Sequence, residues 1–93
     1  MKKPTESRGN VFLDLGFPPE EAAVLKMRSD LMCGLRELIR DRKLTQREAA
    51  QRLGVSQSRV SDLVRGKWEK FNLEMLITLA ARVGRHVVVR LVA

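Results

Sequence analysis

The sequence is poor in several residue types on which whole classes of function depend. Its 93 residues include no tyrosine, one cysteine, one histidine and one tryptophan, and aromatic residues make up 4% of the chain. A single cysteine cannot form an intrachain disulfide framework, and Cys33 lies in an apolar helical stretch, so we interpret it as a small core residue. With His86 as the only histidine and no glycine-rich phosphate loop, we expect no metal site, no cofactor and no catalytic residues, and therefore no enzyme.

Long apolar runs are also missing. No stretch approaches the roughly 18 apolar residues of a membrane span. The start, MKKPTESRGN, has no apolar segment behind its lysines such as a secretory signal would need. We expect a cytoplasmic protein that does not enter a membrane, with residues 1–10 forming a flexible polar tail.

Acidic residues are outnumbered by basic ones. The chain has 18 Lys and Arg against 11 Asp and Glu, a formal net charge of +7 and a pI near 10.5. Residues 1–44 hold nine basic and seven acidic residues (+2), whereas residues 45–93 hold nine and four (+5). The basic excess lies in the second half, which favours an anionic partner such as nucleic acid or a membrane surface. A solvated basic surface would give the same balance.

A long helix is predicted from Pro18-Pro19 to about Arg42, because proline is tolerated in a first turn and the following acids suit the positive end of the helix dipole. Its apolar residues fall on one broad face, with Leu25, Met32 and Ile39 seven residues apart and Leu31, Leu35 and Leu38 in an adjacent stripe. Gly34 interrupts this pattern. We expect it to allow close contact with another helix, with a kink as the alternative.

The most informative segment is TQREAAQRLGVSQSRVSDLVRG, residues 45–66. Thr45 and Glu48 form a capping box, which predicts a helix from Gln46. Gly54 can take the left-handed conformation that ends a helix, and Ser56 can cap a second helix from Gln57. Two short helices separated by a forced turn have the spacing of a helix-turn-helix.

The second helix of this segment has two different faces. At 100° per residue, Val60, Leu63 and Val64 fall on one side, and the opposite side is polar, centred on Ser58, Asp62 and Arg65. Two amphipathic helices of an ordinary bundle would also show polar faces. The combination of caps, turn and the small residues Ala49 and Ala50 favours DNA binding over that alternative.

Several of these residues also resemble a known pattern. Thr45-Gln46, Glu48, Ala50, Gly54-Val55-Ser56-Gln57, Val60, Leu63 and Gly66 resemble the helix-turn-helix of the XRE family of repressor and Cro-like regulators. Ala49 departs from it, since many members carry leucine there. From Asn10 onwards the layout is similar to HigA-type antitoxins, which implies an antitoxin that represses its own operon and neutralises a RelE-like toxin. The alternatives are a free-standing XRE repressor of phage type and an interaction module that uses the apolar cluster Val11–Phe17 and does not bind DNA.

Candidate DNA contacts follow from the two helices and the loop after them. At the start and along the polar face of the second helix, the candidates for reading bases are Gln57, Ser58, Ser61 and Asp62. Asp62 either accepts a hydrogen bond from a cytosine amino group or is held by Arg59 or Arg65. The helix starts and the loop that the resemblance places beside the DNA backbone supply the phosphate candidates Gln46, Ser56, Arg59, Arg65, Lys67 and Lys70. Trp68 is interpreted as a packing residue, with contact to sugar and phosphate as the alternative.

The last eight residues, HVVVRLVA, predict a β-strand because valines cluster and alternate residues share a face. A lone strand leaves its edge open, and the only other candidate strand is Val11–Leu13. We therefore expect 86–93 to pair antiparallel with a second copy through Val87, Val88, Val89 and Leu91. The predicted fold is all-α: a bundle of four to five helices over residues 11–85, with a terminal strand in a homodimer that reads a palindromic operator in double-stranded DNA.

Overall fold

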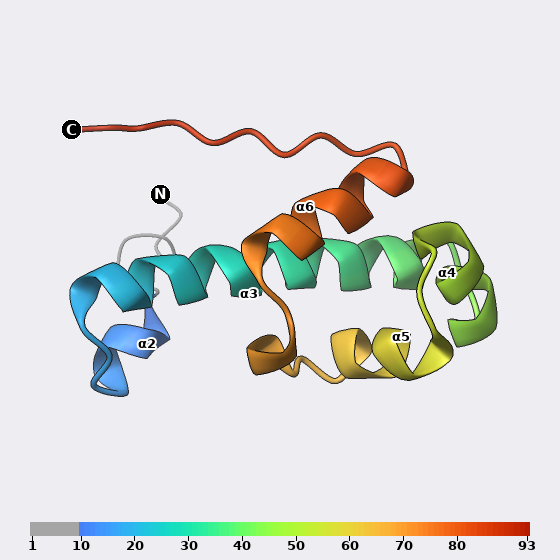
Figure 1. Cartoon of the computed structure of the whole chain (residues 1–93), viewed down its shortest axis with the longest axis horizontal. Helices are drawn as coiled ribbons and strands as arrows, with labels where there is room; N and C mark the ends of the chain where they lie inside the picture. Colours follow the sequence, from blue (N-terminus) through green and yellow to red (C-terminus); the bar gives the residue numbers. More distant parts are fainter. Residues whose placement is uncertain (1–9) are drawn as a thin grey trace.

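A computed structural model describes residues 10–93, and within them every regular element is helical (Figure 1). The predicted helical bundle with a helix-turn-helix is confirmed. Its elements are α2 (Val11–Asp14), α3 (Pro19–Asp41), α4 (Gln46–Leu53), α5 (Gln57–Val64), the short 3-10 helix η1 (Trp68–Lys70) and α6 (Leu73–Arg82).

Helix α3 is the longest element, and the other helices lie along it (Figure 1). It begins after Pro18 with a proline and two acids in its first turn, as the sequence predicts. Its buried face includes the predicted side chains of Leu25, Met32, Leu35, Leu38 and Ile39. This face packs against α5 and α6, so α3 is the support on which the two helices of residues 45–66 are held.

The main core joins α3, α4, α5 and α6, and a smaller cluster fixes α2 to the start of α3. In the smaller cluster Phe12 is buried, and its ring meets those of Phe17 and Trp68 edge to face at centroid distances of 6.0 and 5.3 Å. Trp68 packs against both clusters, which confirms it as a packing residue. The alternative of a strand over Val11–Leu13 is wrong, since these residues form α2, capped by the Asn10 side chain.

Two predictions about α3 are wrong. Cys33 is exposed, and its Sγ lies 3.9 Å from Glu37 Oε2 on the outer side of the helix. Gly34 does not contact another helix, because a Cβ atom added there would meet nothing within 4 Å. Both residues follow buried Met32, yet rotations of 100° and 200° carry them off the buried face.

The segment after α6 differs from the expected strand. Gly84 is left-handed, with φ +79°, and Arg85 N donates to the Ala80 carbonyl at 2.9 Å. From there the chain runs as an extended segment back along the length of α3 (Figure 1). Among residues 10–93 no strand is formed, so the predicted strand at 86–93 is not confirmed; a strand needs a neighbouring backbone, and this chain places none beside the segment.

The amino-terminal tail predicted for residues 1–10 lies outside the described residues except for its last member. Asn10 is ordered: its Oδ1 accepts from Phe12 N at 3.0 Å, and its Nδ2 donates to the Ala22 carbonyl at 3.0 Å. The helices described here include none long and apolar enough to cross a membrane. Over the same residues, no group of His, Cys, Asp and Glu side chains is arranged to hold a metal ion.

Candidate nucleic-acid interface

The start of α4 is fixed by the predicted capping box. Thr45 Oγ1 accepts from Glu48 N at 3.0 Å, and Glu48 Oε1 accepts from Thr45 N at 2.9 Å. Two backbone N–H groups that would have no partner at a helix start are therefore satisfied. Gln46 and Arg47 follow in the first turn with exposed side chains.

The turn between α4 and α5 is stabilised by the backbone conformation of Gly54 and by a side chain from α6. Gly54 has φ +72°, as a left-handed helix end requires. Arg82, from α6, donates from Nη1 to the Leu53 carbonyl at 2.8 Å and so satisfies a carbonyl at the end of α4. The sequence contains no signal for this contact, which spans 29 residues. Ala49 and Ala50 are buried at the contact between α4 and α5, where small side chains let the two helices approach.

Helix α5 has one anchored face and one free face. Ser56 Oγ accepts from Arg59 N at 3.1 Å and caps the helix, while Val60 and Leu63 are almost fully buried. On the free face, Gln57 and Ser58 are exposed. Val64, expected on the buried side, is instead 40% exposed.

The middle of the free face contains Ser61 and Asp62, both partly buried. The Asp62 carboxylate lies 3.9 Å from Lys67 Nζ, and the Lys67 backbone N–H donates to the Asp62 carbonyl at 3.0 Å. The partner of Asp62 is thus Lys67, in the loop after the helix, rather than Arg59 or Arg65. At this distance and exposure the ion pair is weak.

Arginines from neighbouring helices hold the loop between α5 and α6. Arg59 Nη1 donates to the Lys70 carbonyl at 2.9 Å, and its guanidinium lies 5.5 Å from the ring centre of Phe71. Arg28, on α3, donates to the Trp68 carbonyl at 3.4 Å. Arg36 lies so close to left-handed Gly66 that a Cβ there would be 2.8 Å from its Nη1. No local sequence pattern indicates a role in this loop for Arg28 or Arg36, whose contacts span 40 and 30 residues.

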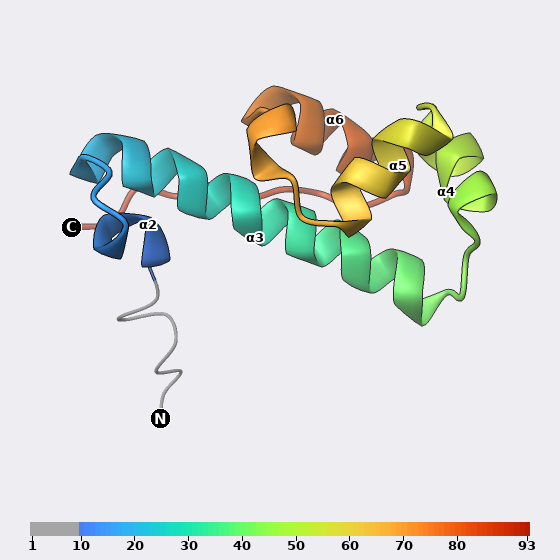
Figure 2. The ribbon, with the colours of Figure 1, turned by 90° about the horizontal axis from the view of Figure 1, so that it is seen from below.

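The starts of α4 and α5 lie near one end of α3, and the loop after α5 lies farther along α3, near the middle of its length (Figure 1). Helices α4 and α5 pack directly against each other, and α5 and η1 lie on the opposite side of α3 from the terminal segment (Figures 1 and 2). The predicted phosphate candidates Gln46, Ser56, Arg65 and Lys70 are exposed, Lys67 and Arg59 partly so. Exposed Arg47 and Arg52 on α4 add two cations that the sequence prediction did not include.

Comparisons with known proteins agree with this geometry. A family model described as a helix-turn-helix domain matches residues 11–91, nearly the whole chain. No curated protein matches the sequence. The matched range includes both capped helices, the Gly54 turn and the loop held by the arginines, so the chain belongs to the helix-turn-helix domain family of regulators.

Proposed function

We propose that this regulator is a sequence-specific repressor that reads DNA with α5. The observation that carries the proposal is the exposed start of α5: Gln57 and Ser58 face solvent, while Val60 and Leu63 fix the opposite side of the same helix. A helix held in this way can enter a major groove as a rigid unit. Glutamine can make a bidentate contact with adenine, and serine is less selective.

Ser61 and Asp62 complete the proposed base-reading face. Asp62 can accept from a cytosine amino group, and its weak ion pair with Lys67 Nζ at 3.9 Å leaves the carboxylate available for that contact. The phosphate contacts are proposed to come from Gln46, Ser56, Arg65, Lys67 and Lys70, with Arg59 using donors that its bond to the Lys70 carbonyl leaves free. These contacts would fix the position of α5 on the duplex.

The proposed repressor would act as a homodimer and bind a palindromic operator. The support is the extended segment 86–93. Its Val88 is 79% and its Leu91 101% exposed, and its backbone groups form no backbone–backbone hydrogen bond within the described residues. Exposed apolar side chains on a free backbone edge favour strand pairing with a second copy. Substituting Val89→Pro removes a backbone donor, so it should shift the protein towards monomer in sedimentation at micromolar concentration.

We further propose that the repressor is the antitoxin of a toxin-antitoxin operon and acts in the cytoplasm. The support is the layout from Asn10 onwards, which is similar to HigA-type proteins. An adjacent reading frame for a small RelE-like toxin, and its co-purification with this chain, would support the antitoxin role. Absence of such a frame would leave a free-standing repressor.

One feature favours a different class, an interaction module that does not bind DNA. Val11, Leu13 and Leu15 are 53%, 49% and 66% exposed in and beside α2, which suits contact with another protein. This alternative predicts no salt-dependent binding to any duplex. The repressor predicts steep salt dependence.

Selection from a random DNA pool tests the repressor proposal. The wild type should select a palindrome. Gln57→Ala should relax base preference at defined positions, by about 1 to 3 kcal/mol for a good contact. Equal loss on operator and random DNA for Gln57→Ala would contradict its base-reading role.

Lys67→Ala should weaken binding to all sequences alike. It should also reduce by about one the slope of the logarithm of the binding constant against the logarithm of the salt concentration.

A further inference from the structure

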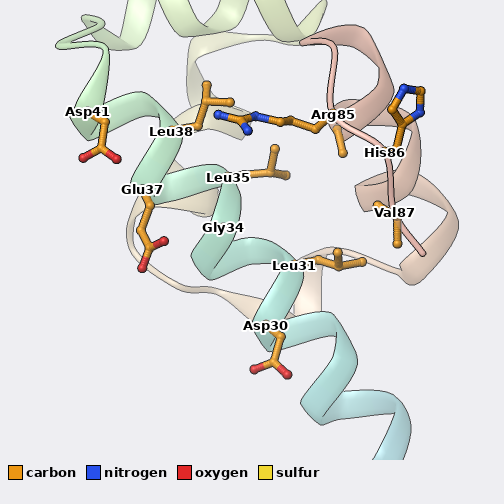
Figure 3. A pocket seen from close by; sticks show the side chains of 11 residues that line it. Asp30, Leu31, Gly34, Leu35, Glu37, Leu38, Asp41, Arg85, His86 and Val87 are labelled. Carbon is orange, nitrogen blue, oxygen red and sulfur yellow. The ribbon is translucent and has the colours of Figure 1, made fainter. Parts of the chain in front are cut away.

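A groove of about 340 Å³ lies between α3 and the start of the terminal segment (Figure 3). Its floor is apolar: Leu31, Leu35 and Leu38 come from α3, and Ala80 comes from α6. Arg85 and Val87 of the terminal segment line the opposite side. The groove is therefore on the side of α3 that faces away from α5 (Figure 1).

Gly34 leaves this groove open, because a Cβ there would meet nothing within 4 Å. The apolar stripe also continues beyond the groove. Met27 and Val24 precede Leu31 by four and seven residues, so all three share one side of the helix. Met27 is 37% and Val24 is 42% exposed, which leaves the amino-terminal half of the stripe uncovered.

The charges beside the groove differ from those of the rest of the molecule. In a chain of net charge +7, the charged residues that α3 contributes to the lining are all acidic, Asp30, Glu37 and Asp41, and Arg85 of the terminal segment is the one arginine or lysine in the lining. Asp30 pairs with Lys26 at 2.9 Å and Asp41 with Arg40 at 3.5 Å, both at exposed sites where such pairs are weak. This acidic rim suits a basic and apolar occupant.

The terminal segment has that composition. Residues 85–93 contain Arg85, His86, Arg90 and five apolar side chains from Val87 to Val92, and no acid. Most of these apolar side chains are exposed, and residues 86–93 make no backbone–backbone hydrogen bond within the described chain. The segment therefore has both side chains to bury and backbone groups to pair.

We propose that the groove is filled by the segment 86–93 of a second copy of this chain. The incoming segment adds as a strand beside the first copy's segment, and its alternate side chains rest on the stripe of α3 from Leu38 to Val24. Backbone bonds then supply affinity, and the groove supplies specificity for the apolar side chains. The inference rests on the proposed homodimer and adds α3 as the second half of its interface.

Filling the groove from within tests the inference. Gly34→Gln places a side chain in open space on a helix that it should not destabilise, since glutamine forms helices better than glycine. We expect the dimer dissociation constant to rise at least about tenfold in sedimentation, a change of 1.4 kcal/mol or more. Cys33→Gln is the matched control, because Cys33 is the exposed neighbour on another side of α3, and it should leave the constant unchanged.

A mixing experiment identifies the occupant. Two full-length proteins carry Cys33→Ser, one with Gly34→Cys and the other with Leu91→Cys. Mild oxidation of the mixture should link the two different chains, and a mixture in which Ala81→Cys replaces Gly34→Cys should not link.

The outcomes separate the inference from the proposed dimer. If Val89→Pro gives monomer while Gly34→Gln dimerises like the wild type and no mixed disulfide forms, the groove is not the site and the strand-paired dimer stands. If the wild type is itself monomeric at micromolar concentration, or Val89→Pro remains fully dimeric, both ideas are overturned.

Discussion

At the scale of single residues, the cationic side chains fall into two groups: those that donate to backbone carbonyls within the chain and those that remain exposed to solvent. Arg82, Arg59 and Arg28 each donate to a backbone carbonyl at distances of 2.8 to 3.4 Å and thereby hold the turn and the loop on either side of α5. Arg65 and Lys70 are exposed and free to meet an anion in solution. A net charge therefore overstates the number of cations available to DNA.

Substituting Arg82→Gln tests the internal role. The loss of a charge-assisted bond to the Leu53 carbonyl should lower the free energy of unfolding by about 1 to 2 kcal/mol, because the last turn of α4 would lose a partner beside Gly54. Urea denaturation without DNA measures it. Arg47→Gln, an exposed cation on α4, is the control and should change stability little. Equal stability of the two variants would contradict the assigned role of Arg82.

Residue roles that depend on near neighbours in sequence could be predicted, and those that depend on distant ones could not. Thr45, Glu48, Gly54 and Ser56 act within three or four residues of their partners, and each was found as expected. Arg82 reaches a carbonyl 29 residues away, which no local pattern indicates. For Asp62 the sequence leaves open a base contact or an ion pair with Arg59 or Arg65, each three residues away, whereas the loop folds back to bring Lys67 to it.

At the scale of elements, the two motif helices are short and depend on their ends. Each of α4 and α5 has eight residues, a length at which an isolated helix is marginal in water. Side-chain caps and buried residues from α3 and α6 therefore keep α5 rigid enough to present Gln57 and Ser58. Loss of a cap should therefore lower the stability of both motif helices.

Replacing Thr45→Ala removes the hydroxyl from the capping box and should lower the free energy of unfolding by roughly 1 kcal/mol. Thr45→Ser keeps the hydroxyl and is expected to match the wild type. Thermal and urea unfolding of the three proteins measure the difference. If Thr45→Ala were as stable as Thr45→Ser, the bond from Glu48 N would contribute nothing to α4.

The type of each element could be predicted where periodicity and caps agree, as in α3 and the motif. The prediction of strands at the two ends of the described chain did not agree with the structure. Val11–Leu13 has strand-forming residues, yet these residues form α2, in which Phe12 packs against Phe17 and Trp68. The segment 86–93 has the pattern of a strand, but the described residues of a single chain offer it no partner, so the proposed pairing would require a second molecule.

At the scale of the whole molecule, two faces lie on opposite sides of α3. One holds α5 and the loop, and the other holds the groove and the terminal segment (Figure 1). A second copy bound at the groove face would leave the proposed base-reading face of each copy uncovered. In the proposed dimer, dimerisation and DNA binding could occur together, and α3 and the terminal segments would set the distance between the two α5 helices.

The operator should therefore tolerate no change in the spacing of its half-sites. Successive major grooves on one side of DNA are about 34 Å apart, which corresponds to 10 to 10.5 base pairs between half-site centres. Inserting five base pairs between half-sites rotates one by half a turn, so binding should fall at least about tenfold, towards that of a single half-site. Fluorescence anisotropy at fixed salt measures it, with five base pairs added outside the half-sites as the control. Equal affinity for the two insertions would show that each chain reads DNA independently, and would contradict a rigid two-fold reader.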